Sequence, residues 1–261
     1  MISNPAPTTM SKHPQKTIPT LHNLAHSQAF RCLWAMEELA ILDPSFTFHV
    51  LNYPRMTPHN TELAKHHRLG KSPIMTLESV DPAEPVPTPQ LEPGILTESK
   101  LILEYINEEY AGGLWNVNDA EDKKRDVFFT QFAIDTVSMK AQFTMLFDIL
   151  PTMCPFPFNH LLSLIITPMS THFLGDLNPV YQLLEDELSA ESPWFSGKKM
   201  GLADFNMQWA LDLGRHRGYL DPEKHPKVWE WTERIRGREA YKRAVEKSGG
   251  KLDLKYFGMK G

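Results

Sequence analysis

The pattern of apolar and polar residues predicts a mixed α/β unit in the first part of the chain. Residues 17–24 (TIPTLHNL) have the length and β-branched content of a strand. Apolar residues then recur at helical spacing as far as Leu42, and Pro44 cannot continue a helix beyond that point. Residues 46–51 (FTFHVL) predict a second strand, which a right-handed crossover places parallel to the first.

Two more strands and a helix complete this unit. Pro73 directly precedes the apolar run 74–77, and proline is confined to strand starts and sheet edges because it cannot donate a ladder hydrogen bond. Residues 80–93 contain five prolines and predict a loop. Residues 95–97 predict a short buried strand, and the apolar spacing over 98–110 (ESKLILEYINEEY) predicts a helix.

After this β-α-β-β-α unit the apolar repeats are helical. The expected helices are residues 119–150, a helix opened by Asn178 and Pro179, residues 201–218, and a helix opened by His225 and Pro226. We therefore expect four parts, namely a disordered leader (1–16), an α/β domain (17–111), an all-helical domain (119–250) and a tail (251–261).

The stretch 149–175 contains no Lys, Arg, Asp or Glu, and its length alone would permit a membrane span. Prolines at positions 151, 155, 157 and 168 interrupt it, as do Asn159, His160 and His172. We therefore expect a loop and a helix beneath a hydrophobic cavity, and no membrane partner.

Composition and charge exclude several classes of protein. The 261 residues are 41% apolar, which is too high for a disordered chain, and the net charge of −5 leaves no basic footprint for nucleic acid. Cys32 and Cys154 belong to no ligand or disulfide spacing, which favours a reducing, cytoplasmic location. His59, His66 and His67 cluster in sequence, but no carboxylate or cysteine completes a ligand spacing, so we expect no metal site.

Five motifs together resemble a known family. They are Ser27-Gln28 with Arg31 after the first strand, Leu69 to Pro73 before the third, Thr97-Glu98-Ser99 at a helix start, Gly201 to Asp204, and the segment Trp229 to Ala244. In this order they resemble the cytosolic glutathione S-transferase superfamily, and the stretch from Trp194 to Asp204 resembles its serine-type class, shared by bacteria and fungi. The resemblance implies an α/β thioredoxin-like N-terminal domain plus an all-α C-terminal domain.

The resemblance implies a catalytic role for Ser27, although a serine at a helix N-terminus is most often only an N-cap. In serine-type enzymes the matching serine holds the sulfur of glutathione. A thiol with a pKa of about 8.5 is mostly protonated at pH 7, and a hydroxyl donor beside a helix N-terminus favours the thiolate. Ser27 would then donate a hydrogen bond, and it would be neither base nor nucleophile.

Five further residues are implied to bind glutathione, used as a cosubstrate or cofactor. A cis proline at Pro73 aims the backbone of Ser72 at the cysteinyl part of the peptide, and Lys71 supplies a cation for the glycyl carboxylate. Ser99 and its helix N-terminus bind the γ-glutamyl carboxylate, while Glu98 accepts from the ammonium group. Without the resemblance these residues indicate only a turn, a solvated lysine and a capped helix start.

The second domain is expected to bind a small, apolar, electrophilic substrate. The candidate lining residues are aromatic or methionine side chains on the long helix and in the charge-free stretch, namely Phe128, Phe132, Met153, Phe156 and Phe158. The leading hypothesis is a homodimeric glutathione transferase. The alternatives are a glutathione-dependent cis-trans isomerase of a conjugated secondary metabolite and a non-catalytic glutathione-binding protein.

One motif departs from the family pattern. Serine or threonine usually stands at the position of Gly201, where its side chain caps the following helix. Asp204 then has a structural role in this capping box. We expect the glycine to weaken the cap without affecting the chemistry.

Overall fold

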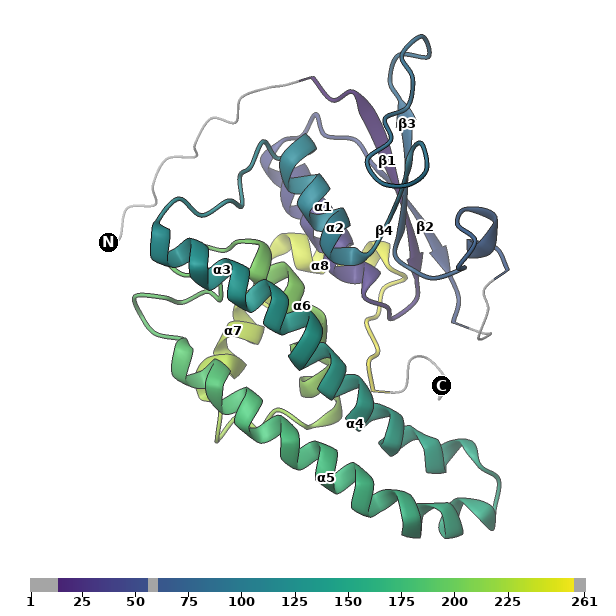
Figure 1. The fold of residues 1–261 in the computed structure, drawn as a ribbon, viewed down its shortest axis with the longest axis vertical. Helices are drawn as coiled ribbons and strands as arrows, with labels where there is room; N and C mark the ends of the chain where they lie inside the picture. The colour runs from purple at the N-terminus through teal and green to yellow at the C-terminus, as the bar shows by residue number, and fades with distance from the viewer. Residues whose placement is uncertain (1–13, 56–60, 256–261) are drawn as a thin grey trace.

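The computed structural model describes residues 14–55 and 61–255, so His59, most of the expected leader and the end of the tail lie outside it. Four strands form one mixed sheet in the order β2-β1-β3-β4. The β1–β2 pair is parallel and the other two pairs are antiparallel. The strands are β1 (Thr17–Leu24), β2 (His49–Tyr53), β3 (Ile74–Ser79) and β4 (Ile95–Thr97). The predicted β-α-β-β-α order is confirmed (Figure 1).

Helices make up the remainder of the ordered elements. The first unit contributes α1 (Ala29–Leu42), the short 3-10 turn η1 (Leu63–Lys65), α2 (Ser99–Tyr105) and the π-turn η2 (Ile106–Tyr110). The second part is helical, as predicted, with α3 (Ala120–Phe132), η3 (Ala133–Ser138), α4 (Met139–Ile149), η4 (Leu150–Met153), α5 (Phe158–Glu187), α6 (Leu202–Arg217), α7 (Pro226–Gly237) and α8 (Glu239–Lys247).

The strand predicted from Phe46 begins three residues later, at His49. Phe46 turns inward, where its ring lies 5.2 Å from the ring of Tyr110 and 5.5 Å from that of Phe48. The parallel ladder with β1 starts only at the Thr20–His49 pair. The strand therefore starts later than predicted because burial of the Phe46 ring stabilises the fold more than one additional pair of strand residues would.

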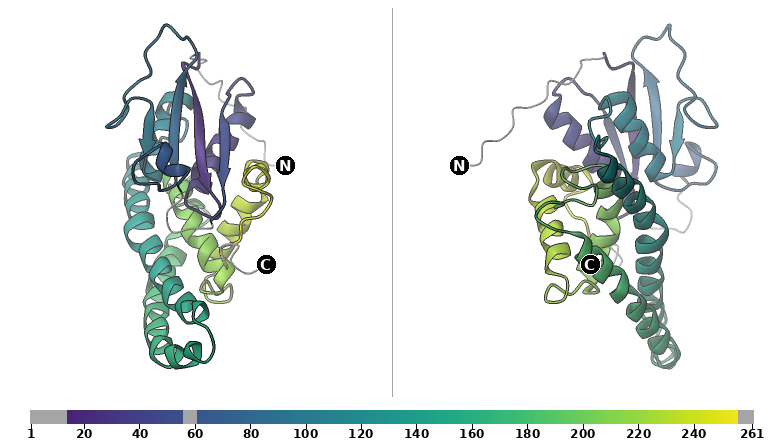
Figure 2. Two further views of the ribbon diagram at one scale, coloured as in Figure 1. Left: turned by 90° about the vertical axis from the view of Figure 1, so that its right-hand side faces the viewer. Right: turned by 60° about the vertical axis from the view of Figure 1, so that its left-hand side comes forward.

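Helix α1 lies between the sheet and the helices of the second part, and every residue from Ala29 to Leu39 is buried (Figure 2). Two carboxylates in this buried stretch are neutralised from across the interface. Glu37 pairs with Arg243 at 3.0 Å and with Lys247, while Glu38 pairs with Arg238. These contacts fix α8 against the first unit.

The prediction that Pro179 opens a helix is wrong, because α5 runs without a break through both Pro168 and Pro179. The two prolines are 11 residues apart, which is close to three full turns, so they share one face. Both are exposed, and the carbonyls that lose a donor belong to Leu164 and Gly175, on the same exposed side. Water can satisfy these carbonyls, and the buried face of α5 continues to pack on α4.

The expectation that Gly201 leaves a weak cap is also wrong, because the cap comes from another helix. Asp126 of α3 accepts the Ala203 N–H at 2.9 Å and the Ser196 hydroxyl at 2.5 Å. A Cβ at position 201 would lie 2.6 Å from the Ser196 oxygen. Glycine is therefore required where Ser196 and Asp126 occupy the space of a capping side chain.

Within the second part, α4 and α5 form a long hairpin, which projects away from the sheet in Figure 1. Within residues 14–55 and 61–255, no helix has the length and apolar content needed to cross a membrane.

Candidate active site

The register of the sheet brings three distant segments to one edge. Ile74 at the start of β3 pairs with His22 of β1 on one side and with Thr97 of β4 on the other. The residues just before Ile74 therefore lie beside the end of β1 and the start of α2. This places Ser72 and Pro73 between the turn that carries Ser27 and the Glu98–Ser99 pair.

Ser27 is 5% exposed and sits at the N-terminus of α1. Its Oγ accepts the Ala29 N–H at 3.1 Å, while the N-cap position of α1 is the next residue, Gln28, which makes no side-chain cap. The same oxygen lies 3.4 Å from Oγ of Ser72. The side chain thus has a fixed orientation and one remaining proton to donate.

The hydroxyl of Ser72 determines which serine is the donor in that contact. Ser72 Oγ donates to the His22 carbonyl at 2.9 Å and accepts the Leu24 N–H at 3.0 Å. Since a hydroxyl has a single proton, Ser27 is the donor toward Ser72. At 3.4 Å this bond is long and weak, so the Ser27 proton is available to a better acceptor.

The Ser72–Pro73 peptide bond is cis, as the family resemblance implies. Only backbone contacts were expected of Ser72, whereas its side chain also bonds this turn to β1. No sequence signal distinguishes such a serine from any other turn serine. Lys71 is exposed and takes part in no ion pair with another described residue.

Glu98 and Ser99 form the junction between β4 and α2. Glu98 has a φ of 66° and its side chain is exposed, so it points away from the packed core. A non-glycine residue in this region is strained, and such strain is concentrated at functional sites. The Ser99 carbonyl contacts the Cys32 sulfur at 3.6 Å, which holds the start of α2 against α1. Burial raises the pKa of the Cys32 thiol to about 12, so this cysteine stays protonated.

Arg31 places a buried positive charge one turn into α1. Its guanidinium donates to the backbone carbonyl of Asn206 at 3.1 Å and to the side chain of Gln28. Among the described residues it forms no ion pair with a carboxylate, and burial lowers its pKa to about 10. The residue is still charged at pH 7, and its charge adds to the positive end of the α1 dipole.

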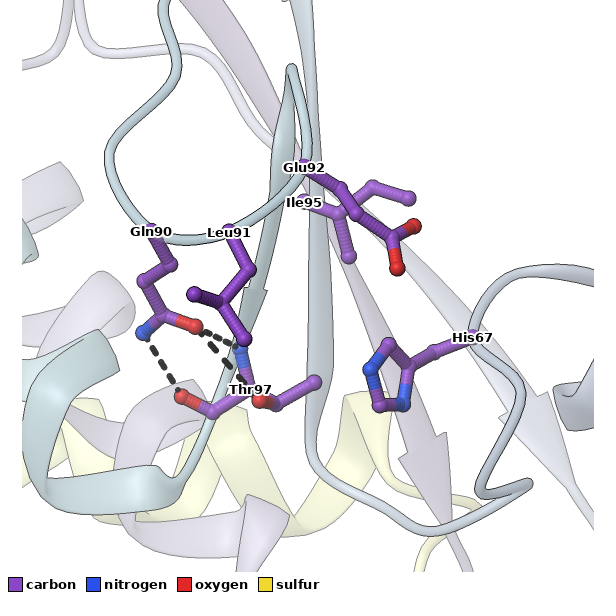
Figure 3. A pocket seen from close by; sticks show the side chains of 6 residues that line it. All are labelled: His67, Gln90, Leu91, Glu92, Ile95 and Thr97. Carbon is purple, nitrogen blue, oxygen red and sulfur yellow. Dashed lines mark hydrogen bonds between the residues drawn. The ribbon is translucent and has the colours of Figure 1, made fainter.

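A small pocket of about 20 Å³ lies next to this edge (Figure 3). The side chain of Gln90, from the proline-rich loop, accepts a hydrogen bond from the Thr97 N–H at 3.0 Å and donates one to the Thr97 carbonyl at 2.9 Å. It therefore extends the sheet like an added strand beside β4. His67 faces the pocket from the opposite side. Gln90 could not be predicted, because a glutamine among five prolines carries no pattern in the sequence.

The structure divides the predicted substrate residues into two groups. Phe128 and Phe132 stack on α3, where the neighbouring Gln131 accepts a hydrogen bond from Lys100, directly after Ser99. Met153, Phe156 and Phe158 lie at the outer end of the α4–α5 hairpin, with exposed fractions of 64–78%. The structure does not bring this second group to Ser27, because α4 carries it away from the sheet (Figure 1).

No group of three or more His, Cys, Asp or Glu side chains could hold a metal ion within the described ranges. The ring of His66 lies tilted against that of His22, with ring centres 4.0 Å apart, and both nitrogens of His22 form hydrogen bonds, with Tyr53 and Thr76.

Comparisons with known proteins agree with this architecture. A solved glutathione S-transferase from Actinobacillus pleuropneumoniae superimposes with a TM-score of 0.65 over 93% of this chain and 98% of its own, at 19% identity. The chain has the glutathione S-transferase fold. The family model "Glutathione S-transferase, C-terminal domain" matches residues 173–239. Glutathione S-transferase 1 of Saccharomyces cerevisiae is 23% identical over 234 residues, which are 87% of this chain and 94% of the relative.

One similar structure also carries a glutathione conjugate. Ure2p5 from Phanerochaete chrysosporium was crystallised with 1-(S-glutathionyl)-2,4-dinitrobenzene and has a TM-score of 0.65, at 17% identity over 92% of this chain and 97% of its own. Together with the family model and the yeast relative, this similarity supports a place in the glutathione S-transferase superfamily.

Proposed function

We propose that the protein is a serine-type glutathione transferase in which Ser27 stabilises the glutathione thiolate. The observation that carries the proposal is the state of the Ser27 hydroxyl. Its oxygen is oriented by the Ala29 N–H, and its proton has only a weak 3.4 Å contact with Ser72. A thiolate is a stronger acceptor than a second hydroxyl, so the proton would turn to the bound sulfur.

The surrounding charges favour the same anion. The sulfur would lie at the N-terminus of α1, where the positive end of the helix dipole and the buried Arg31 provide positive potential. These groups lower the free energy of the thiolate relative to the thiol. The thiol proton is then released to solvent, and the hydroxyl of Ser27 remains protonated throughout.

The rest of the tripeptide would be held by the two neighbouring segments. The backbone of Ser72, exposed at the cis-proline turn, would pair with the cysteinyl part, and Lys71 would face the glycyl carboxylate. The exposed Glu98 and the start of α2 at Ser99 would bind the two charges of the γ-glutamyl group. The sheet register supports this assignment because it places all three segments at one edge.

The thiolate would attack an electrophilic carbon of an apolar substrate. A carbon–sulfur bond forms, and a leaving group such as halide departs with the bonding pair. Phe128 and Phe132, beside α2, are the proposed substrate contacts. Met153, Phe156 and Phe158 would contribute only if a substrate or a second chain reached the hairpin end. A homodimer and a cytoplasmic location are part of the proposal, and solution sizing and cell fractionation test them.

Incubation with glutathione and a dinitro-substituted aryl halide tests the function. We expect conjugation by the wild type and a loss of about 100-fold or more in kcat/KM in Ser27→Ala, which corresponds to about 3 kcal/mol. Ser45→Ala, at an exposed turn, is the matched control. Glutathione binding without conjugation would favour the isomerase or the binding protein. Absence of glutathione binding would exclude all three.

A further inference from the structure

The turn that carries Ser27 contains a strained residue. His26 has a φ of 59°, and Glu98 is the only other non-glycine residue with a positive φ in the described parts of the chain. The Cβ of histidine disfavours this conformation, so external contacts must hold it in place. If His26 relaxed to a negative φ, the peptide between His26 and Ser27 would rotate and the Ser27 hydroxyl would move.

Three contacts hold this turn from outside. The Ala25 N–H donates to the Tyr53 carbonyl at 2.8 Å, and the Arg55 side chain donates to the Ala25 carbonyl at 3.1 Å. The third contact acts on the strained residue itself. The backbone N–H of Asp253 donates to Nδ1 of His26 at 3.0 Å, across 227 positions of sequence.

The segment that makes this third contact is built to reach the turn. After α8 the chain reverses at Gly249 and Gly250, whose φ values of 108° and 81° favour glycine. Leu254 is then fully buried, and the Lys255 carbonyl accepts from Arg217 at the end of α6. Figure 1 shows this yellow segment running from α8 past the end of the sheet.

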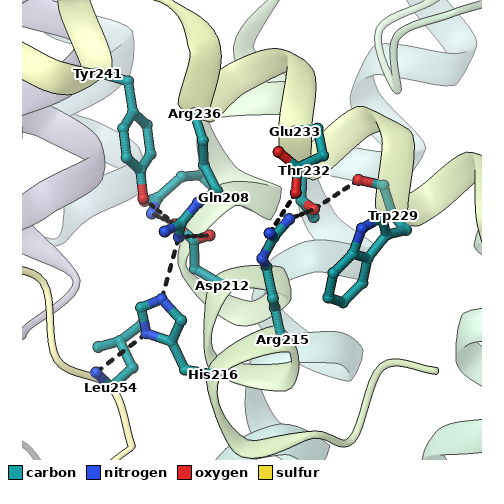
Figure 4. A network of polar contacts seen from close by, with 10 residues as sticks. All are labelled: Gln208, Asp212, Arg215, His216, Trp229, Thr232, Glu233, Arg236, Tyr241 and Leu254. Atoms are coloured by element: carbon teal, nitrogen blue, oxygen red, sulfur yellow. Dashed lines mark hydrogen bonds and ion pairs between the residues drawn. The ribbon is translucent and has the colours of Figure 1, made fainter. Parts of the chain in front are cut away.

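The far end of the segment is tied to the second part of the molecule. The Leu254 N–H lies 3.3 Å from Nδ1 of His216, which belongs to α6 (Figure 4). Nearby, the buried Asp212 accepts from Gln208 at 2.6 Å and from Arg236 at 3.1 Å. The segment therefore connects the rigid core of α6 and α7 to the turn before α1.

We propose that His26 is a positioning residue, and that the segment Lys251–Lys255 holds Ser27 in its donating orientation through the Asp253–His26 hydrogen bond. This inference rests on the proposed function, since it concerns how Ser27 stabilises the thiolate. The neutral state of the ring agrees with it, because Nδ1 accepts a hydrogen bond and burial lowers the pKa of His26. His26 touches neither the sulfur nor the substrate in this role.

His26→Gly is the first test, because glycine tolerates the positive φ while it removes the acceptor. The readout is the ultraviolet absorbance of bound thiolate as a function of pH, which gives the pKa of the glutathione thiol in the complex. We expect that pKa to rise by about one unit, so that thiolate at pH 7 and kcat fall by up to about tenfold. The KM for glutathione should change by less than about twofold, since the peptide is held elsewhere.

Asp253→Pro is the second test, because it removes the donor N–H and leaves the His26 side chain in place. Asp253→Ala is its matched control, since it keeps the backbone N–H. We expect Asp253→Pro to reproduce the change in thiol pKa seen in His26→Gly, and Asp253→Ala to retain the wild-type thiol pKa. Thermal unfolding of all variants separates this effect from a general loss of stability.

The outcomes distinguish the two proposals. If the wild type shows no bound thiolate, the proposed function fails. If the wild type shows it and His26→Gly and Asp253→Pro leave its pKa unchanged, the proposed function stands and the role of His26 is excluded. Equal effects of Asp253→Pro and Asp253→Ala would also exclude the backbone hydrogen bond as the cause.

Discussion

The junction that α6 forms with α1 and α3 and the outer end of the α4–α5 hairpin are built in opposite ways. At this junction, buried or half-buried polar side chains bond across large sequence separations, as with Arg31 and Asn206 or Asp126 and Ala203. At the hairpin end, apolar side chains are exposed, including Phe156 at 78%.

This difference explains why the sequence predicts the proposed glutathione-binding residues but not the proposed substrate contacts. Recognition of a fixed peptide requires donors and acceptors at fixed positions, and these leave a residue pattern in the sequence. Contact with a variable apolar partner requires only an apolar surface, which many sequences provide.

The largest expected effect on stability comes from replacing Asp204, which lies at this junction. It is fully buried and accepts the backbone N–H of Phe195 at 2.9 Å and of Gly201 at 3.0 Å, and the indole N–H of Trp231 at 2.9 Å. Asp204→Ala should lower the free energy of unfolding by about 3–5 kcal/mol, because these donors lose their acceptor. Urea unfolding measures this, with Asp204→Asn, which keeps one oxygen, expected to lose less. A loss below about 1 kcal/mol for Asp204→Ala would contradict the network.

Asp126 provides the next largest effect, since it caps α6 from another helix. Asp126→Ala should cost about 1–2 kcal/mol of unfolding free energy, as the loss of an N-cap does. Asp135→Ala, an exposed carboxylate further along the same helical run, is the matched control and should change little. Gly201→Ser should not rescue Asp126→Ala, because its Cβ would lie 2.6 Å from the Ser196 oxygen. Rescue would show that the cap does not need Asp126.

The sequence predicted the elements of the first unit well because their signals are local. Strand β1 matches its predicted range, 17–24, and β4 matches 95–97. The prediction of a helix start from the position of Pro179 was wrong at α5, because packing against α4 outweighs the free-energy cost of Pro168 and Pro179. The cap of α6 was also beyond prediction, because its acceptor, Asp126, stands 77 residues away from Ala203.

The candidate site was predictable in its residues but not in its geometry. The motifs identified Ser27, Ser72 and Glu98, yet only the fold shows that Ser27 is the donor toward Ser72. His26 has no sequence signal, because its strain and its contact with Asp253 exist only in the folded chain. Long-range backbone contacts of this kind leave no periodicity to detect.

Acid should lower the stability of the protein through His22, a buried polar residue of β1. Burial and the nearby His66 lower the pKa of His22 from 6.5 to about 4, while both ring nitrogens are bonded to Tyr53 and Thr76. The unfolded chain therefore binds a proton first as the pH falls below 6.5, and stability is lost progressively from there down to about 4.

Urea unfolding at pH 7.5 and pH 5 measures this loss. The wild type should lose about 1–2 kcal/mol more than His22→Gln between the two values, after allowance for solvent screening at the site. His172→Gln, at an exposed position of α5, is the control and should follow the wild type. An equal loss in His22→Gln and the wild type would assign the acid sensitivity to other groups.

The smallest expected effect on stability lies at the outer end of the α4–α5 hairpin, where apolar side chains are exposed. Leu164 and Leu184 both belong to α5, but Leu164 is 74% exposed and Leu184 is fully buried. Leu164→Ala should change the free energy of unfolding by less than about 0.5 kcal/mol, whereas Leu184→Ala should cost about 2–5 kcal/mol. The same substitution on one helix thus reports only the difference in surroundings. A cost above about 1 kcal/mol for Leu164→Ala that grows with protein concentration would mean that a second chain buries the hairpin end, since only association makes stability concentration-dependent.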